Sequence, residues 1–218
     1  MITLTPFLRN LDGKVKEVLM VSTDVSTEVK LTTRLQANFL ATFQSLASII
    51  DARDSYTGKH SSNVHFYTAL ILKGLDLSEE LASDILTAAM LHDIGKVGIS
   101  DDILKKVGSL EQWEYEIMKR HSATGAELLV GIEQFNSCSY YVRHHHEKWD
   151  GHGYPDGLIG GNIPIGAQII CIADAFDAMT SERVYRKARS MKESINELNA
   201  NRWKQFNGNY DNMFGARP

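Results

Sequence analysis

The sequence has few cysteines, few prolines and no excess of positive charge. Its 218 residues include 2 Cys and 4 Pro, and 23 Lys and Arg are outnumbered by 27 Asp and Glu. The net charge of -4 argues against a nucleic-acid coat protein or an anionic-membrane binder, because the affinity of such proteins comes from excess Lys and Arg. Cys138 and Cys171 stand far apart with no metal-type spacing, so we expect two small buried thiols in a reducing compartment.

Long apolar runs are missing as well. The longest, such as 88–91 and 169–173, are far too short for a membrane-spanning helix of about 20 residues. The first residues are neither basic nor followed by an apolar segment, so we expect no signal peptide, no membrane span in this segment and a cytoplasmic protein. The 43% hydrophobic content suffices for one core, which predicts one main domain and at most a fragment of another.

Residues 1–28 have the pattern of a β-hairpin. Asp12-Gly13 is a turn signal, because this dipeptide accepts positive φ at low cost, and an apolar, β-prone run follows at 15–21. A lone hairpin is marginally stable, so we expect these residues to belong with a larger unit.

Residues 29–50 have a helical period instead. Apolar residues recur there at steps of three or four, on one helix face, at Leu31, Leu35, Phe39, Phe43, Leu46 and Ile50. Two interpretations stay open. Either the stripe packs against the helix's own domain, or it pairs two linker helices in a short coiled coil, for which about three heptads are the minimum.

Residues 51–218 are expected to form one helical domain. Helical periods separated by loops cover 63–72, 79–91, 111–121, 124–132, 137–145, 165–179 and 191–201. A long glycine-rich loop at 149–164 interrupts them, and a loop of such length inside a compact domain is usually functional. The predicted fold class is therefore mainly α, a helical bundle preceded by a short hairpin and a linker helix.

Histidine has an uneven distribution along the chain. Six of the 8 histidines fall between residues 92 and 152. The side chains suited to binding a metal or a phosphate are His60, the pair His92-Asp93, Lys96, His121, the run His144-His145-His146, and Asp174. Imidazole and carboxylate ligands without thiolates favour iron, manganese, zinc or cobalt.

Each of these residues has an ordinary structural explanation when it is considered alone. A single His on an apolar helix is more often a hydrogen-bonded residue than a ligand, and Lys96 alone could be a solvated cation. Asp174 is different, because a carboxylate inside the apolar run 169–176 is costly to bury unless it is paired or metal-bound. His65 lies five positions after His60, on another helix face, and is given no role. The joint presence of the others favours a metal site.

An adjacent His-Asp pair suits a centre with two metal ions. A phosphodiester is anionic and repels a hydroxide nucleophile, and two cations can bridge the attacking water and the phosphoryl oxygens. Asp93 can bridge two ions while His92 cannot, and Gly95 allows close backbone approach just beyond the pair. We therefore predict a metal-dependent phosphodiesterase, with Asp93 as the bridging ligand and Lys96 within reach of a phosphate.

Five longer motifs follow one another in the second part of the chain. They are Asp54-Ser-Tyr-Thr-Gly-Lys-His60; Leu91-His-Asp-Ile-Gly-Lys-Val-Gly-Ile99; His145-His-Glu-Lys-Trp-Asp-Gly-His-Gly-Tyr-Pro155; Ile163-Pro164; and Ala173-Asp-Ala-Phe-Asp-Ala-Met-Thr-Ser181. In this order they closely resemble the HD-GYP family of bacterial cyclic-di-GMP phosphodiesterases, a branch of the HD-domain phosphohydrolases. The resemblance covers about Asp51 to about Leu198, and Gly153-Tyr154-Pro155 is similar to the signature that names the family.

The resemblance implies two divalent metal ions and the residues that hold them. Iron or manganese is expected first, with zinc, cobalt or nickel as alternatives. The implied ligands are His60, His92, Asp93, His121, His145, His146 and Asp174. We assign His60, His92 and Asp174 to one ion and His121, His145 and His146 to the other, with Asp93 bridging; His144 is left unassigned.

The resemblance also implies the reaction and the residues next to the substrate. These residues are Lys96, on a phosphate, with Tyr154, Asp177, Arg183 and Arg186, and catalysis depends on Asp93 and Lys96. The implied reaction is hydrolysis of cyclic di-GMP to pGpG or GMP in bacterial second-messenger signalling. Two alternatives stay open. Ligand residues do not recognise a base, so the substrate could be another cyclic dinucleotide or nucleotide, and a non-catalytic nucleotide-sensing module is the third hypothesis, which the complete ligand set disfavours.

Some positions depart from the family pattern. Tyr56 stands where some members carry a glutamate that helps to hold a third metal, so we expect two ions. Asn63 stands where arginine is usual. The residues after Asn201 follow the family poorly, so the last helix is expected to be truncated.

The N-terminal segment has a resemblance of its own. Asp12-Gly13 and the run 18–25 resemble the final hairpin of a PAS sensor domain. This would make 1–28 a PAS-like remnant, 29–50 a signalling helix and 51–218 the phosphodiesterase domain. The partners implied are a second copy of the chain, paired through the linker helix, and a diguanylate cyclase or other signalling domains, without nucleic acid.

Overall fold

The structure is a computed structural model that describes residues 2–9, 11–54, 58–182 and 187–209. By its internal contacts the chain divides into two compact units, Met1–Thr42 and Phe43–Pro218. The division falls inside helix α1 (Ser26–Arg53). Within the described residues, no helix is both long and apolar enough to span a membrane.

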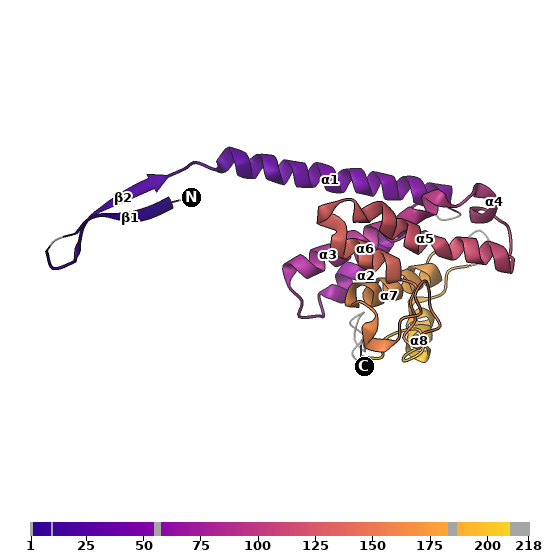
Figure 1. The fold of residues 1–218 in the computed structure, drawn as a ribbon. Coiled ribbons are helices and arrows are strands. Elements are labelled where there is room, and N and C mark those ends of the chain that lie inside the picture. Colours follow the sequence, from indigo (N-terminus) through magenta and orange to yellow (C-terminus); the bar gives the residue numbers. More distant parts are fainter. Residues whose placement is uncertain (1, 10, 55–57, 183–186, 210–218) are drawn as a thin grey trace. The chain divides into compact units, whose positions relative to one another are not determined.

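The first unit contains a hairpin and the first part of α1. Strands β1 (Ile2–Arg9) and β2 (Val15–Ser22) pair antiparallel, with Ile2 opposite Ser22 (Figure 1). Gly13 lies in the turn between them with a φ of 76°, a conformation that glycine adopts without steric cost. The expected hairpin is present, and its origin in a PAS domain stays a prediction.

Helix α1 differs in exposure along its length. In residues 26–42 the apolar side chains are exposed at Val29, Leu31, Leu35 and Phe39. In residues 43–53, Ala47 and Ile50 are buried, and Phe43 packs edge-on against Phe135 with 4.8 Å between ring centroids. From Phe43 onward the apolar stripe therefore packs within the second unit, and the predicted linker 29–50 contributes its last residues to the bundle.

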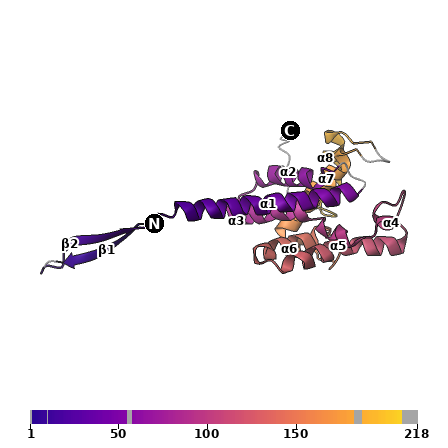
Figure 2. The same cartoon turned by 90° about the horizontal axis from the view of Figure 1, so that it is seen from above.

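The second unit is a helical bundle, so the mainly α prediction is confirmed. Its longer helices are α2 (His60–Leu72), α3 (Glu79–Leu91), α5 (Gln112–Val130), α6 (Asn136–His144), α7 (Ile165–Thr180) and α8 (Met191–Ala200), with the short segments α4 (Asp101–Leu104), η1 (Ile94–Gly98), η2 (Glu133–Phe135) and η3 (Gly160–Asn162) between them. Helix α6 contacts α3, α5 and α7, while α2 contacts α3 and α7, and α8 packs on α7 (Figures 1 and 2).

Helices α3 and α7 supply much of the core. Phe176, Ile169 and Ile170 of α7 and Ile85 of α3 are fully buried, and burial of each such side chain contributes about 2 kcal/mol. The Ser78 hydroxyl caps α3 by accepting a hydrogen bond from the backbone N–H of Leu81. Helix α3 then ends where the chain turns into η1, which places His92 and Asp93 at the edge of the core.

One predicted boundary is wrong. The segments 111–121 and 124–132 were expected as two helices, but they form the single helix α5, Gln112–Val130. Within this helix Gly125 lets α5 approach its neighbours, because a Cβ there would meet Gly95 and Val142. The short segments η1 and α4 carry too few residues to show a period, so they were not predicted.

Candidate metal centre

A glycine contact sets the position of the His92-Asp93 pair. Both residues are buried, with 1% and 5% of their surface exposed. Two residues later, a Cβ on Gly95 would collide with the backbone of His121 and Gly125. Only glycine therefore lets η1 lie against α5, and this contact brings Asp93 to His121.

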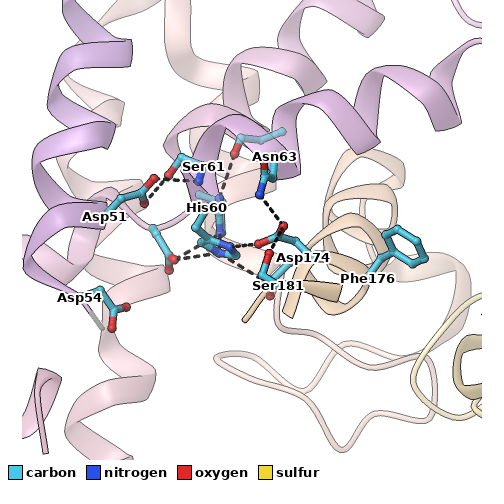
Figure 3. Close-up of polar contacts among 12 residues, drawn as sticks. Asp51, Asp54, His60, Ser61, Asn63, Asp174, Phe176 and Ser181 are labelled. Carbon is cyan, nitrogen blue, oxygen red and sulfur yellow. Dashed lines mark hydrogen bonds and ion pairs between the residues drawn. The ribbon is translucent and has the colours of Figure 1, made fainter. Parts of the chain in front are cut away.

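The first group of ligand-type side chains joins three helices. His60 begins α2, His92 follows α3 and Asp174 lies in α7. The Nε2 atoms of His60 and His92 are 3.3 Å apart. Oδ1 of Asp174 is 3.3 Å from His60 Nε2 (Figure 3). One ligand atom from each of the three lies within 4.8 Å of the others, close enough to share one ion.

The second group consists of imidazoles only. His121 lies in α5, and His145 and His146 directly follow α6. The ring centroids of His121 and His146 are 5.0 Å apart, and those of His145 and His146 are 4.0 Å apart. One nitrogen from each ring lies within 4.8 Å of the other two.

Asp93 lies between the two groups. Its Oδ2 is 3.3 Å from His92 Nε2 and 3.5 Å from His60 Nε2. Its Oδ1 is 3.4 Å from His121 Nε2. One carboxylate therefore presents one oxygen to each group, which is the arrangement needed for a ligand shared by two cations.

Backbone carbonyls orient three of the imidazoles. The Nδ1 atoms of His92, His121 and His145 lie 2.7 to 2.8 Å from carbonyl oxygens three residues earlier, those of Ala89, Met118 and Val142. Nδ1 then carries the proton, and the lone pair of Nε2 faces the centre. Among the described residues, the buried Nε2 atoms of His121 and His145 have no hydrogen-bond partner. A buried polar atom without a partner is rare, and a divalent cation fits these positions.

The two groups differ in their affinity for protons. Burial, with His146 and His92 nearby, holds the pKa of His145 well below its ordinary value. Burial and the neighbouring His121 lower the pKa of His146 to about 3. These rings are neutral at physiological pH and can therefore offer a lone pair to a metal.

In the first group, nearby carboxylates raise the pKa of a histidine instead of lowering it. Burial disfavours the imidazolium of His60, but Asp174 and Asp177 outweigh it and raise its pKa well above the ordinary value. Burial likewise disfavours the Asp93 carboxylate, yet Lys96 and His92 hold its pKa well below the usual range. Asp93 is thus ionised and able to act as a ligand.

Asp177 was expected beside the substrate, but it lies behind His60. It is fully buried, and its Oδ2 accepts a hydrogen bond from His60 Nδ1 at 2.7 Å. Its Oδ1 accepts from the side chains of Asn63 and Ser181, each at 2.8 Å. Asp177 therefore orients His60 from behind, away from the face that points into the centre.

Of the other residues expected beside the substrate, the structure describes Lys96 and Tyr154. Lys96 is 9% exposed, and its Nζ lies 2.8 Å from Asp93 Oδ2. The Tyr154 ring packs on His146 with 4.8 Å between centroids. Both side chains thus border the centre. Arg183 and Arg186 lie outside the described residues, as does Tyr56.

Two residues beside the His145-His146 pair act on the glycine-rich loop. Glu147 is buried, and its carboxylate accepts the backbone N–H groups of residues 156, 157 and 158 at 2.7 to 3.0 Å. His144 Nε2 lies 2.8 Å from Asp156 Oδ2, outside both ligand groups. Sequence reasoning gave Glu147 no role, although its place directly after the histidine pair was the available signal.

The chain is similar in sequence to proteins of one known family. A family model described as an HD domain matches residues 44–209. The chain is 40% identical over 167 residues to a cyclic di-GMP phosphodiesterase response regulator of Xanthomonas campestris pv. campestris, covering 76% of this chain and 44% of that protein. It is 35% identical over 202 residues to the 3'3'-cGAMP-specific phosphodiesterase 2 of Vibrio cholerae, covering 91% of this chain and 39% of that protein.

Solved structures share the fold. The crystal structure of a cyclic GMP-AMP specific phosphodiesterase of V. cholerae superimposes with a TM-score of 0.60 at 21% identity, covering 79% of this chain and 47% of that one. A structure described as an HDG"Y"P protein from Bdellovibrio bacteriovorus gives 0.59 at 17% identity, covering 71% and 50%. The chain spans less than half the length of the curated relatives it matches.

Proposed function

Because the chain belongs to the HD domain family, we propose that it is a metal-dependent phosphodiesterase that hydrolyses a cyclic dinucleotide, with cyclic di-GMP as the first candidate. The observation that carries the proposal is the pair of ligand groups that share Asp93, with the unpartnered Nε2 atoms of His121 and His145 facing inward. The names of the relatives support the substrate class.

Two divalent ions are proposed, iron or manganese first, with zinc, cobalt or nickel as alternatives. His60, His92 and Asp174 would hold one, His121, His145 and His146 the other, and Asp93 would bridge them. When bound, the ions supply Lewis acidity toward a phosphoryl oxygen and lower the pKa of an attacking water.

The chain's own side chains account for substrate binding. The Lys96 ammonium lies at the edge of the centre and would contact a non-bridging phosphate oxygen. Burial, with Tyr115 and Asp174 nearby, raises the pKa of Tyr154 well above its ordinary value, so its hydroxyl stays protonated and can donate a hydrogen bond. Arg183 and Arg186 remain proposed phosphate contacts.

A second cyclic dinucleotide is a serious candidate. Three V. cholerae relatives at 35% to 40% identity are named 3'3'-cGAMP-specific phosphodiesterases. The ligand set is the same for either substrate, because metals bind the phosphate and not the base. The product is proposed to be the linear dinucleotide, such as pGpG, or the mononucleotide GMP.

The setting of this domain is part of the proposal. The N-terminal hairpin would be the end of a PAS-like sensor, and α1 would pair with a second copy in the cytoplasm. The exposed Leu31, Leu35 and Phe39 support pairing through the first part of α1. A diguanylate cyclase or another signalling domain would be a further partner.

Direct hydrolysis tests the proposal. Protein loaded anaerobically with Fe²⁺, Mn²⁺ or Co²⁺ is incubated separately with cyclic di-GMP and 3'3'-cGAMP, and linear products are separated by chromatography. Turnover of either is expected, with loss in His92→Ala and little change in His65→Ala. His65 is a suitable control because its Nδ1 bonds to the Leu86 carbonyl, outside both ligand groups. No product with any metal or substrate would refute the proposal.

A further inference from the structure

The end of helix α1 and the residue after it contact the start of α2, which carries His60, and the segment η1 that follows the His92-Asp93 pair. Oδ2 and Oδ1 of Asp51 accept hydrogen bonds from the backbone N–H and the hydroxyl of Ser61 at 2.9 and 2.8 Å, directly after His60 (Figure 3). Arg53 donates to the Ile99 carbonyl at 3.2 Å, just past η1. Residues 51–54 therefore hold the start of α2 and the end of η1 together.

Asp54 makes the contact closest to the centre. Its Oδ2 lies 2.7 Å from the Nζ of Lys96, and the same ammonium lies 2.8 Å from Asp93 Oδ2. The side chains of Lys96 and Asp54 are each 11% exposed, so solvent screens this ion pair only weakly. Lys96 thus joins the proposed bridging ligand to a carboxylate that belongs to neither ligand group.

This arrangement matters most when cations are bound. Two divalent ions would engage the Asp93 oxygens and would repel an ammonium only a few ångströms away. A buried ammonium that loses its neutralising carboxylate is costly to keep in place. Asp54 supplies a negative charge that competes with neither ion and holds Lys96 at the rim.

We propose that Asp54 is the positioning residue for Lys96, which makes the end of α1 a determinant of both metal binding and substrate contact. The inference rests on the proposed metal centre. Asp54 does not contact the reacting atoms, so its effect passes through Lys96.

Metal affinity without turnover is the first readout. Binding of Mn²⁺ is measured by equilibrium dialysis for the wild type, Asp54→Asn, Lys96→Met and the double variant. Asp54→Asn is expected to weaken binding about 10- to 100-fold, in the range seen when a residue supporting a ligand is lost. The double variant is expected to regain wild-type affinity, since no unneutralised ammonium then remains beside the ions.

Substrate kinetics form the second readout. Asp54→Asn is expected to raise the KM for the cyclic dinucleotide at saturating Mn²⁺ by about 10-fold, the equivalent of one charge-assisted contact, and Asp54→Glu to restore part of it. The matched control is Asp76→Asn, because Asp76 is exposed in the loop between α2 and α3 and belongs to neither ligand group. Thermal unfolding of each metal-free variant verifies that it folds.

The outcomes separate the two proposals. If the wild type binds no Mn²⁺, the metal centre itself fails and this inference fails with it. If the wild type binds Mn²⁺ and Asp54→Asn binds it equally well, only the role of Asp54 is overturned. If the double variant binds as weakly as Asp54→Asn, Asp54 has a structural role that does not pass through Lys96, and the inference is likewise overturned.

Discussion

The two ligand groups differ in what holds their imidazoles in place. In the group of His60, His92 and Asp174, His60 is oriented by the side chain of Asp177. In the group of His121, His145 and His146, the first two rings are oriented by backbone carbonyls of Met118 and Val142. His92 of the first group also bonds to a backbone carbonyl, that of Ala89. The groups therefore differ at His60, whose support is a side chain that a single substitution removes, while the bonds of His121 and His145 follow from the course of the helices.

The surroundings also differ in charge. Asp174 and Asp177 face His60, whereas the neighbours of His145 are other histidines. A carboxylate-supported imidazole is a more basic ligand than one that bonds to an amide carbonyl. The two positions are thus chemically unequal, although Asp93 joins them.

Removing one ligand from each group should have the largest effect. Asp174→Ala and His146→Ala are each expected to lose about one of two bound ions and to lower turnover roughly 10³-fold or more, about 4 kcal/mol in the barrier. Metal analysis with turnover assays measures both. Loss of both ions from either variant would show that the groups are not separate positions.

Asp177→Asn should affect one group only. The amide cannot accept the His60 proton with the same strength, so metal affinity at the first group is expected to fall about 10- to 100-fold. The second group should keep its affinity. A Mn²⁺ titration that becomes biphasic supports the comparison, and equal weakening of both positions contradicts it.

Gly95→Ala tests the backbone contact that joins the groups. The added Cβ would collide with the backbone of His121 and Gly125, so the free energy of unfolding is expected to fall by about 1–3 kcal/mol. Gly131→Ala is the matched control, because a Cβ there meets no atom within 4 Å. Urea unfolding of the metal-free proteins compares them, and equal stability of the two variants would refute the contact.

Ser181→Ala should have the smallest effect. It removes one hydrogen bond, 2.8 Å long, to Asp177, and one such bond contributes about 1 kcal/mol. We expect roughly 5-fold weaker Mn²⁺ binding at the first group, with the Asn63 contact still in place. Thr180→Val is a neighbouring control, since the Thr180 hydroxyl donates to the Phe176 carbonyl and not to Asp177. Equal weakening of Mn²⁺ binding in the two variants would show that the effect of Ser181→Ala does not act through Asp177.

The sequence indicated which side chains lie close together around Asp93, but not the contacts that support them; that they bind metal stays a prediction. The His-Asp pair, the helical periods and the five motifs were enough to list the residues that the fold gathers around Asp93. Asp177 could not be placed, because it lies three positions from Asp174, a spacing that allows either side chain to face the centre. The hydrogen bonds of Glu147 depend on how the loop 156–158 folds back, which no local pattern reveals.

Helix boundaries failed for a related reason. The predicted break at 122–123 lies inside α5, on the part of that helix that packs against Gly95 of η1. Tertiary contacts of this kind override local propensity. The stripe on α1 was ambiguous because the helix has two surroundings, with Leu31, Leu35 and Phe39 exposed and Ala47 and Ile50 buried.

Metal content per chain tests the central claim most directly. Protein purified anaerobically is analysed for metal, together with Asp93→Ala. The shared-carboxylate arrangement predicts about two ions per chain in the wild type and loss of metal in Asp93→Ala. A wild-type value near zero, or an Asp93→Ala variant that retains both ions, would contradict it.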